Sequence, residues 1–270
     1  MRRLLVLLLA LAACAPRPPP SVPVAETPPL EYPAATRARL LRILEGEWRE
    51  WGARIVDGRT HAPLDRDEGP VAEQAPAAFS KVLAYWSAVD WQDYITRNKR
   101  AFARGAERCD APERAAGGRD AVWGCQPWSA AFIAFALRSA GIDRAEFPPA
   151  AAHWVYVDAL IAAGDRWGGR ATFLAHDVTE YAPVAGDMIC FARGARPLAS
   201  LAQRRAEAGT PRPMHCDIVS ETAPGEVLAL GGNVAQAVTA VRYATGPDGR
   251  LRRNVRPWFV VFENRIGLAP

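Results

Sequence analysis

The chain has 270 residues, half of them hydrophobic, and a formal net charge of +4 at pH 7. Two of those positive charges, Arg2 and Arg3, lie in an N-terminal segment that we expect to be removed, which leaves +2. A balance so close to neutral argues against a nucleic-acid partner. The apolar content is sufficient for one domain with a sizeable core, with or without a helical N-terminal extension.

The first residues have the form of an export signal. Arg2 and Arg3 precede an apolar run, residues 4–11, that is too short to span a bilayer. The segment Leu11-Ala12-Ala13-Cys14 resembles the lipobox of bacterial lipoproteins, in which the cysteine is diacylated and becomes the first residue. We therefore expect residues 1–13 to be a signal peptide and Cys14 a lipidation site. The alternative is an ordinary secretory signal with an incidental cysteine.

Residues 14–33 form the predicted tether. Positions 15–33 contain eight prolines and no apolar periodicity, which is typical of an extended spacer roughly 60 Å long at about 3.1 Å per residue. Ala15 follows the cysteine, and by resemblance to Gram-negative lipoproteins this favours the outer membrane. The expected location is the periplasmic face of the envelope, with the membrane contacted through lipid alone.

Helical periodicity dominates the first half of the remaining chain. Apolar residues spaced by three and four predict a helix from about Thr36 to Ile55, and a Gly- and Pro-containing loop follows at 57–74. A second helical stretch is expected from Pro76 to about Ala106. The clearest helix, about Trp128 to Ala140, is bounded by Pro127 and Gly141, and another is expected over 151–163.

Beyond Thr179 the apolar period changes to two, which predicts strands. An insertion rich in Arg, Ala and Pro, residues 193–213, separates the first two of them. Helices followed by strands indicate an α+β fold with an antiparallel sheet. We divide the chain into a helical extension at 34–75 and a main domain at 76–270. The predicted strands are Asp187–Phe191, His215–Glu221, Glu226–Gly231, Val238–Tyr243 and Phe259–Glu263.

Four cysteines remain besides Cys14, an even number that suggests two disulfides in an oxidising compartment. Cys109 and Cys125 bracket a Gly- and charge-rich loop, and a bridge between them would contribute roughly 3 kcal/mol. Cys216 and Cys190 lie on neighbouring predicted strands and fit a cross-strand bridge. No C-x-x-C occurs, so the spacing does not indicate a zinc site, and no cofactor is expected.

Three short segments supply a hydroxyl, an imidazole and an amide. Ser129 stands at a predicted helix start, where free N–H groups and the helix dipole would stabilise an oxyanion, although serine is also a common N-cap there. His215 opens a predicted strand and shares a face with Asp217, which could partly supply a carboxylate. Asn233 follows Gly231-Gly232 and could orient the imidazole or simply occupy a turn. His153 starts another helix and could line the same cleft.

Together these segments resemble a known superfamily. Pro127-Trp128-Ser129-Ala130-Ala131-Phe132-Ile133, Pro183-Val184-Ala185-Gly186-Asp187, His215 at a strand start and Gly231-Gly232-Asn233 resemble the CHAP amidase branch of the NlpC-type papain-like superfamily. Within it, the match is best to the bacterial family called domain of unknown function 2272, over roughly residues 80–265.

The resemblance implies a papain-like α+β fold with N-terminal helices packed on a small antiparallel sheet, and activity on amide bonds in peptidoglycan. Ser129, His215 and Asn233 would be nucleophile, base and orienting residue, with Trp128, His153 and Asp217 around the substrate. The superfamily nucleophile is a cysteine, and Ser129 replaces it here. Two hypotheses follow: a serine-dependent amidase or endopeptidase, or an inactive module that binds peptidoglycan or an envelope protein. A third is an assembly factor that works through its N-terminal helices.

Overall fold

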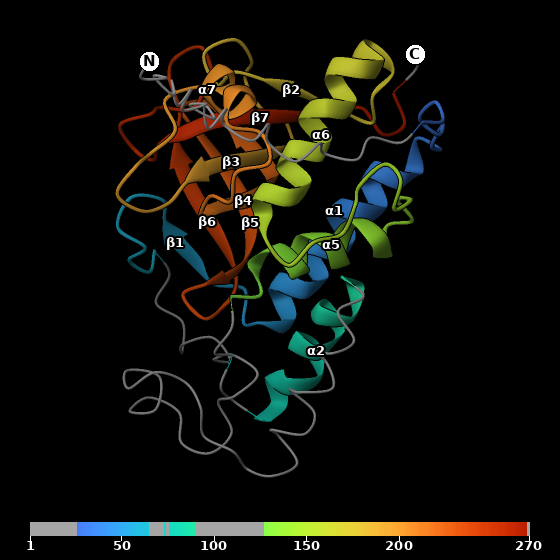
Figure 1. Ribbon diagram of the computed structural model, residues 1–270. Helices are drawn as coiled ribbons and strands as arrows, with labels where there is room; N and C mark the ends of the chain where they lie inside the picture. Colours follow the sequence, from blue (N-terminus) through green and yellow to red (C-terminus); the bar gives the residue numbers. More distant parts are fainter. Residues whose placement is uncertain (1–25, 65–72, 74–75, 90–126, 269–270) are drawn as a thin grey trace, which may run out of the picture.

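A computed structural model describes residues 26–64, 73, 76–89 and 127–268 (Figure 1). Its helices gather on one side of a twisted sheet, so the mixed α+β class expected from the sequence is confirmed. The described part contains five α-helices. They are α1 (Ala35–Glu50), α2 (Phe79–Ala88), α5 (Ser129–Ser139), α6 (His153–Trp167) and α7 (Leu201–Ala206).

The described strands form one seven-stranded sheet in the order β1-β6-β5-β4-β3-β7-β2. Neighbours are antiparallel except β1 and β6, which run parallel. The five predicted strands are confirmed, each within three residues of its expected ends. The strands are β1 (Ile55–Asp57), β2 (Phe173–His176), β3 (Met188–Ala192), β4 (Met214–Ala223), β5 (Glu226–Val234), β6 (Ala237–Ala244) and β7 (Trp258–Asn264).

The N-terminal helix ends earlier than its apolar periodicity predicts. The helix stops at Glu50, because Gly52 and Ala53 adopt positive φ angles of 93° and 54° and turn the chain away. Ile55 therefore belongs to β1, not to the helix. The predicted helix over 128–140 is confirmed as α5, and the one over 151–163 continues four residues further as α6.

The insertion at 193–213 contains a short helix that the sequence pattern did not predict. Ser200 caps α7, its hydroxyl accepting a hydrogen bond from the backbone N–H of Gln203 at 3.1 Å. Arg204 of this helix is fully buried and donates to both carboxylate oxygens of Asp158 on α6. The insertion is therefore anchored to the helical layer.

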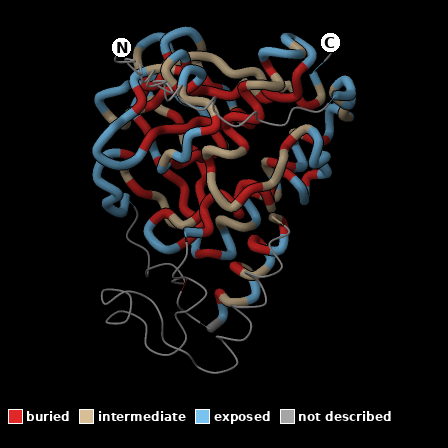
Figure 2. The backbone as a smooth tube through the Cα atoms, in the orientation of Figure 1, coloured by how far each residue is buried: buried red, intermediate tan, exposed pale blue. Residues whose placement is uncertain are grey.

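Both faces of the sheet are buried (Figure 2). The helices cover one face, where side chains such as Leu40, Phe132 and Leu160 pack against Ile218 and Phe262. The opposite face carries a second apolar cluster, whose buried members include Val56, Ile189, Val219, Val241 and Trp258. Alternate residues of each central strand therefore enter different clusters.

The N-terminal elements share the main core. Leu44 and Trp51 are completely buried, and Arg37 donates to the carbonyls of Ala185 at 3.0 Å and Asn264 at 2.9 Å. The end of the predicted tether also lies on the domain, since the Tyr32 hydroxyl accepts from the N–H of Asp143 at 2.9 Å.

Several sequence predictions fall outside the described residues. They are the signal peptide, Cys14, most of the tether, the Cys109–Cys125 bridge and the second helix beyond residue 89. Among the helices that are described, none has the length and apolar character needed to cross a bilayer.

Candidate active site

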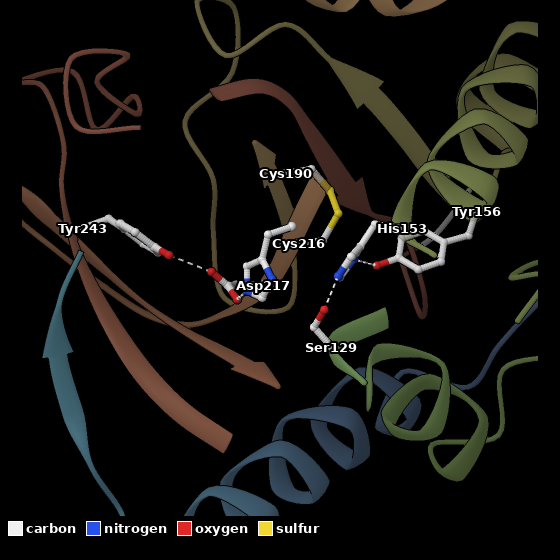
Figure 3. The surroundings of a disulfide bond; sticks show 8 residues. Ser129, His153, Tyr156, Cys190, Cys216, Asp217 and Tyr243 are labelled. Atoms are coloured by element: carbon white, nitrogen blue, oxygen red, sulfur yellow. Dashed lines mark hydrogen bonds and ion pairs between the residues drawn. A yellow bond between two sulfur atoms is a disulfide. The ribbon is translucent and has the colours of Figure 1, made fainter. Parts of the chain in front are cut away.

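Ser129 is the first residue of α5, at the point where the helix packs against β4 and β5. The residue before it, Trp128, occupies the N-cap position, and no side chain caps the helix. The Ser129 hydroxyl instead lies 2.7 Å from Nε2 of His153 (Figure 3). The alternative in which Ser129 is only a helix cap is therefore wrong.

His153 is the first residue of α6 and is 5% exposed. Its second ring nitrogen, Nδ1, contacts the hydroxyl of Tyr156, one helical turn further on. Burial is the main cause that lowers the pKa of His153 well below 6.5, and the positive charges of His215 and Arg193 add to it. The imidazole is therefore neutral near pH 7 and can accept a proton from the serine hydroxyl.

Tyr156 completes this chain of contacts as a phenol, not as an anion. Burial, followed by the charge of Asp217, raises the pKa of its hydroxyl well above 10. In the tautomer with the proton on Nδ1, His153 donates to the Tyr156 oxygen and leaves Nε2 free to accept from Ser129. Ser129 thus has His153 as a base, and Tyr156 orients the His153 ring. Tyr156 carries no charge, unlike the carboxylate of a Ser-His-Asp triad.

A second array begins at the start of β4. Because side chains alternate along the strand, His215 and Asp217 share a face, and His215 Nε2 lies 2.8 Å from Asp217 Oδ1. The other carboxylate oxygen accepts from the Tyr243 hydroxyl at 2.7 Å (Figure 3). Tyr243 comes from β6, two strands away in the sheet.

The carboxylate of Asp217 is fully buried, yet its lowered pKa keeps it ionised near pH 7. Burial alone would raise its pKa, but the His215 charge and the hydrogen bonds from His215 and Tyr243 outweigh that effect and lower it. Since an ionised carboxylate only accepts, Nε2 of His215 must carry a proton and donate it. Nδ1 is then the nitrogen of His215 that is not used by Asp217.

The two histidines meet at the boundary between the helical layer and the sheet. Their ring centroids are 5.2 Å apart and their planes are inclined by 58°. From the sequence, His215 was predicted to take the proton of Ser129 directly. In the structure, His153 contacts the serine hydroxyl instead. His215 contacts the ring of His153 on the side of the sheet.

The Gly231-Gly232-Asn233 segment brings both arrays together through close approaches. A Cβ on Gly231 would lie 1.9 Å from Asp217 Oδ1, and one on Gly232 would lie 2.5 Å from Cβ of Phe132. The first glycine therefore makes room for the carboxylate of the sheet array. The second lets the helix that carries Ser129 pack closely on β5.

Asn233 does not perform the orienting role predicted for it. Its backbone has a φ of 55°, and its amide turns toward Glu73 and Trp128. In the orientation that satisfies both ends of the amide, its nitrogen donates to Glu73 Oε2 at 3.0 Å and its oxygen accepts from the Trp128 N–H at 3.3 Å. Asp217 orients His215. Asn233 instead binds the backbone of Trp128, the N-cap residue of α5.

The substrate-contacting role predicted for Trp128 also fails. Its side chain is fully buried, stacks on Trp51 at 5.3 Å between ring centroids, and donates to Glu73 Oε2 at 2.7 Å. Asp217 is likewise inaccessible. Of the three side chains expected around a substrate, His153 alone lines a pocket.

The predicted bridge between Cys190 and Cys216 is confirmed. The two cysteines stand directly opposite each other on β3 and β4, with Cα atoms 4.2 Å apart. Cys216 is adjacent to His215 in the chain but faces the helical layer, as the strand alternation predicts. The bridge therefore ties the strand of His215 to its neighbour (Figure 3).

Two pockets open beside the histidines. One, of about 290 Å³, is lined by Ser129, His153 and residues on both sides of them. The other, of about 480 Å³, is lined by His215, Asn233 and Tyr243. Arg193 lines both. Among the described residues, no three or more His, Cys, Asp or Glu side chains are grouped as metal ligands would be.

Several residues of this region were not predicted from the sequence. Tyr156 follows His153 by three positions on a helix, a spacing that predicts contact and was a usable signal. Tyr243 and His61 reach the site from distant segments, and no local pattern marks them. His176 lies outside the site and pairs with Glu263 at 2.9 Å.

Among the comparisons with known proteins, a family model matches this chain. The family model DUF2272, described as an uncharacterized protein conserved in bacteria, matches residues 73–264. The matched range contains every residue of both arrays. No curated protein and no solved structure matches the chain significantly.

Proposed function

The chain belongs to the DUF2272 family, and from the geometry of its site we propose that it is a hydrolase of amide bonds in peptidoglycan peptides, with Ser129 as the nucleophile. The observation that carries this proposal is the 2.7 Å contact between Ser129 Oγ and Nε2 of a neutral His153. A serine hydroxyl barely ionises at neutral pH and needs such a base.

The proposed reaction is acyl transfer. Ser129 Oγ attacks the amide carbon while His153 Nε2 takes the hydroxyl proton, and the carbonyl oxygen becomes an oxyanion. The first backbone N–H groups of a helix have no partner within the helix, so those of Ser129 and Ala130 are placed to donate to that oxyanion. The His153 imidazolium returns that proton to the departing amine. Water then gives a proton to His153 as it attacks the acyl-enzyme, which releases the acid and restores the Ser129 hydroxyl.

His215 has a supporting part in this scheme. Asp217 and Tyr243 fix its ring through buried hydrogen bonds, and its Nδ1 is the nitrogen left for other groups. Its ring adjoins that of His153, and when its Nδ1 also carries a proton it can donate to a leaving amine or to the substrate carbonyl. We assign it to substrate and proton handling and not to the activation of Ser129.

The papain-like assignment belongs to the same proposal. It is supported by a nucleophile position at a helix N-terminus packed against a sheet that carries a histidine. The cell-envelope location is supported by the lipobox-like Leu11-Ala12-Ala13-Cys14, and a Cys14→Ala variant should lose incorporation of labelled fatty acid.

A second candidate function is a binding module without activity. It is favoured by the neutral partner of His153, because the hydroxyl of Tyr156 stabilises an imidazolium less than a carboxylate would. Such a module would keep the cleft to bind peptidoglycan or an envelope protein.

One experiment separates the two functions. Wild type, Ser129→Ala and Ser129→Cys chains are incubated with peptidoglycan sacculi, and soluble fragments and pelleted protein are measured. The hydrolase predicts fragments from wild type that disappear with Ser129→Ala. Equal pelleting of all three without fragments identifies the binding module, and cleavage by Ser129→Cys alone identifies a site that has lost its original nucleophile.

A further inference from the structure

The larger of the two pockets beside the histidines has a positive lining. Its positive charges come from Arg193 and Arg256, which line it together with His61 and His215, and none of its described lining residues is acidic. Phe191 and Tyr243 also line it. A concave site with convergent cations and no carboxylate in its wall favours an anionic ligand.

Arg256 is held in this pocket with unused donors. Its guanidinium lies over the ring of Phe191, 5.5 Å from the centroid, and its Nη2 donates to Nε2 of His61. The Nε atom is buried, and no described residue accepts a hydrogen bond from it. An arginine keeps its charge at any physiological pH, so His61 accepts as a neutral ring, in keeping with its lowered pKa, for which burial is the main cause and Arg256 the next.

Arg193 contributes a second guanidinium between the two pockets. Its backbone N–H donates to the carbonyl of Pro213 at 2.8 Å, which fixes the position of the residue at the end of β3. Its exposed side chain forms no ion pair with any residue in the described part of the chain. Its charge acts on both His153 and His61, as expected for a residue that lies between them.

The nearby carboxylates have other partners. Asp217 lies behind the pocket wall, hydrogen-bonded to His215 and Tyr243. Asp57 is close enough to Arg256 for their charges to interact, but its carboxylate accepts from the N–H groups of Arg59 and Thr60 at 3.0 and 2.8 Å. Neither carboxylate therefore occupies the pocket.

We propose that Arg193 and Arg256 form a binding subsite for the free carboxylate of a peptide, adjacent to the pocket of Ser129. The planar guanidinium of an arginine matches the geometry of a carboxylate, and two arginines line this pocket. This inference rests on the proposed function, because it places the carboxylate of the substrate in one pocket and its amide in the next. It assigns the enzyme to peptides that carry a free carboxylate near the amide that is cleaved.

The test measures binding in the absence of turnover. The full chain carrying Ser129→Ala is titrated calorimetrically with N-acetyl-D-alanyl-D-alanine and with the same dipeptide as its C-terminal amide. We expect the acid to bind at least tenfold more tightly than the amide. Arg193→Gln and Arg256→Gln, each added separately, should remove that preference. The matched control is Arg250→Gln, because Arg250 pairs with Asp248 on a remote turn.

Each outcome decides the proposal. Equal binding of acid and amide, absence of binding, or an equal effect of Arg250→Gln overturns it, as does tighter binding of inorganic phosphate than of the dipeptide acid. Arg193 is exposed, so its variant remains informative if Arg256→Gln fails to fold. A preference for the acid without cleavage of sacculi would refute only the hydrolase, whereas cleavage without that preference would refute only the subsite.

Discussion

The Cα of Gly231 on β5 faces the carboxylate of Asp217 on β4 so closely that a Cβ atom there would lie 1.9 Å from Oδ1. The same Cβ would lie 3.1 Å from Nε2 of His215. The hydrogen bond between these two side chains therefore depends on the absence of a side chain on the neighbouring strand. The glycine is required by space, and not by a positive φ angle.

Gly231→Ala should accordingly disturb the buried array. The Asp217 carboxylate is held by two hydrogen bonds and cannot move without losing one. We expect the free energy of unfolding to fall by about 2–3 kcal/mol, measured by urea denaturation. Gly46→Ala is the matched control. Its Cβ would meet nothing within 4 Å on a helix, so it should raise stability by about 0.5–1 kcal/mol. A neutral Gly231→Ala would contradict the close approach.

The buried His153 should make stability depend on pH. Its folded pKa is below the 6.5 of the unfolded chain, mainly through burial, so between those two values the unfolded chain binds a proton that the folded chain does not. The contribution of His153 is thus complete above pH 6.5 and decreases as pH falls toward the folded pKa. The slope is up to about 1.4 kcal/mol per pH unit. Unfolding of wild type and His153→Gln from pH 7.5 to 5 tests this, and parallel curves would be evidence against it.

The Cys190–Cys216 bridge should contribute substantially to stability. Closing a segment with a sequence separation of 26 corresponds to about 3–4 kcal/mol in the chain-entropy model. Dithiothreitol should lower the denaturation midpoint of wild type by a corresponding amount. In the double variant Cys190→Ser/Cys216→Ser, dithiothreitol should shift the denaturation midpoint less. Any remaining shift would come from Cys109 and Cys125. Non-reducing peptide mapping should recover residues 190 and 216 in one linked pair, and free thiols at both would refute the bridge.

Arg37 should be a strong link between α1 and the sheet. Its guanidinium donates to the carbonyls of Ala185 and Asn264 and lies 3.5 Å from the buried Asp187. Arg37→Gln removes these charge-assisted contacts and should lower the free energy of unfolding by about 2–3 kcal/mol. Arg42→Gln, on an exposed position of the same helix, should change it by less than about 0.5 kcal/mol. Equal effects of the two changes would show that the contacts of Arg37 are not specific.

The strands were predictable because alternation is a local signal. His215, Asp217 and Val219 do share one face, and the cysteine between them faces the other, as the period of two requires. β1 and β2 were missed for different reasons. β1 is three residues long and follows a helix with the same apolar spacing. β2 is a short segment that becomes a strand only because it pairs with β7 at the sheet edge.

Individual residues of the site could be predicted from the sequence, but not which of them contact each other. Ser129 and His215 were found from their positions at element starts. Which histidine meets the serine depends on the start of α6 lying beside the start of α5. This arrangement is set by tertiary packing, and the residues next to Ser129 in the sequence do not indicate it. The same holds for Asn233, whose left-handed backbone turns its amide toward Trp128 and Glu73. A motif of three residues predicted the turn, but not the direction of its side chain.

The parallel pairing of β1 with β6 has a consequence for biosynthesis. Ile55 is registered with Ala240, so the edge of the sheet cannot close until the ribosome has made more than 180 further residues. Trp51 can be covered earlier, because its partners Tyr85 and Trp128 both precede Ala240 in the chain. The β1 edge of the sheet is therefore completed after the helices of the described part have been made.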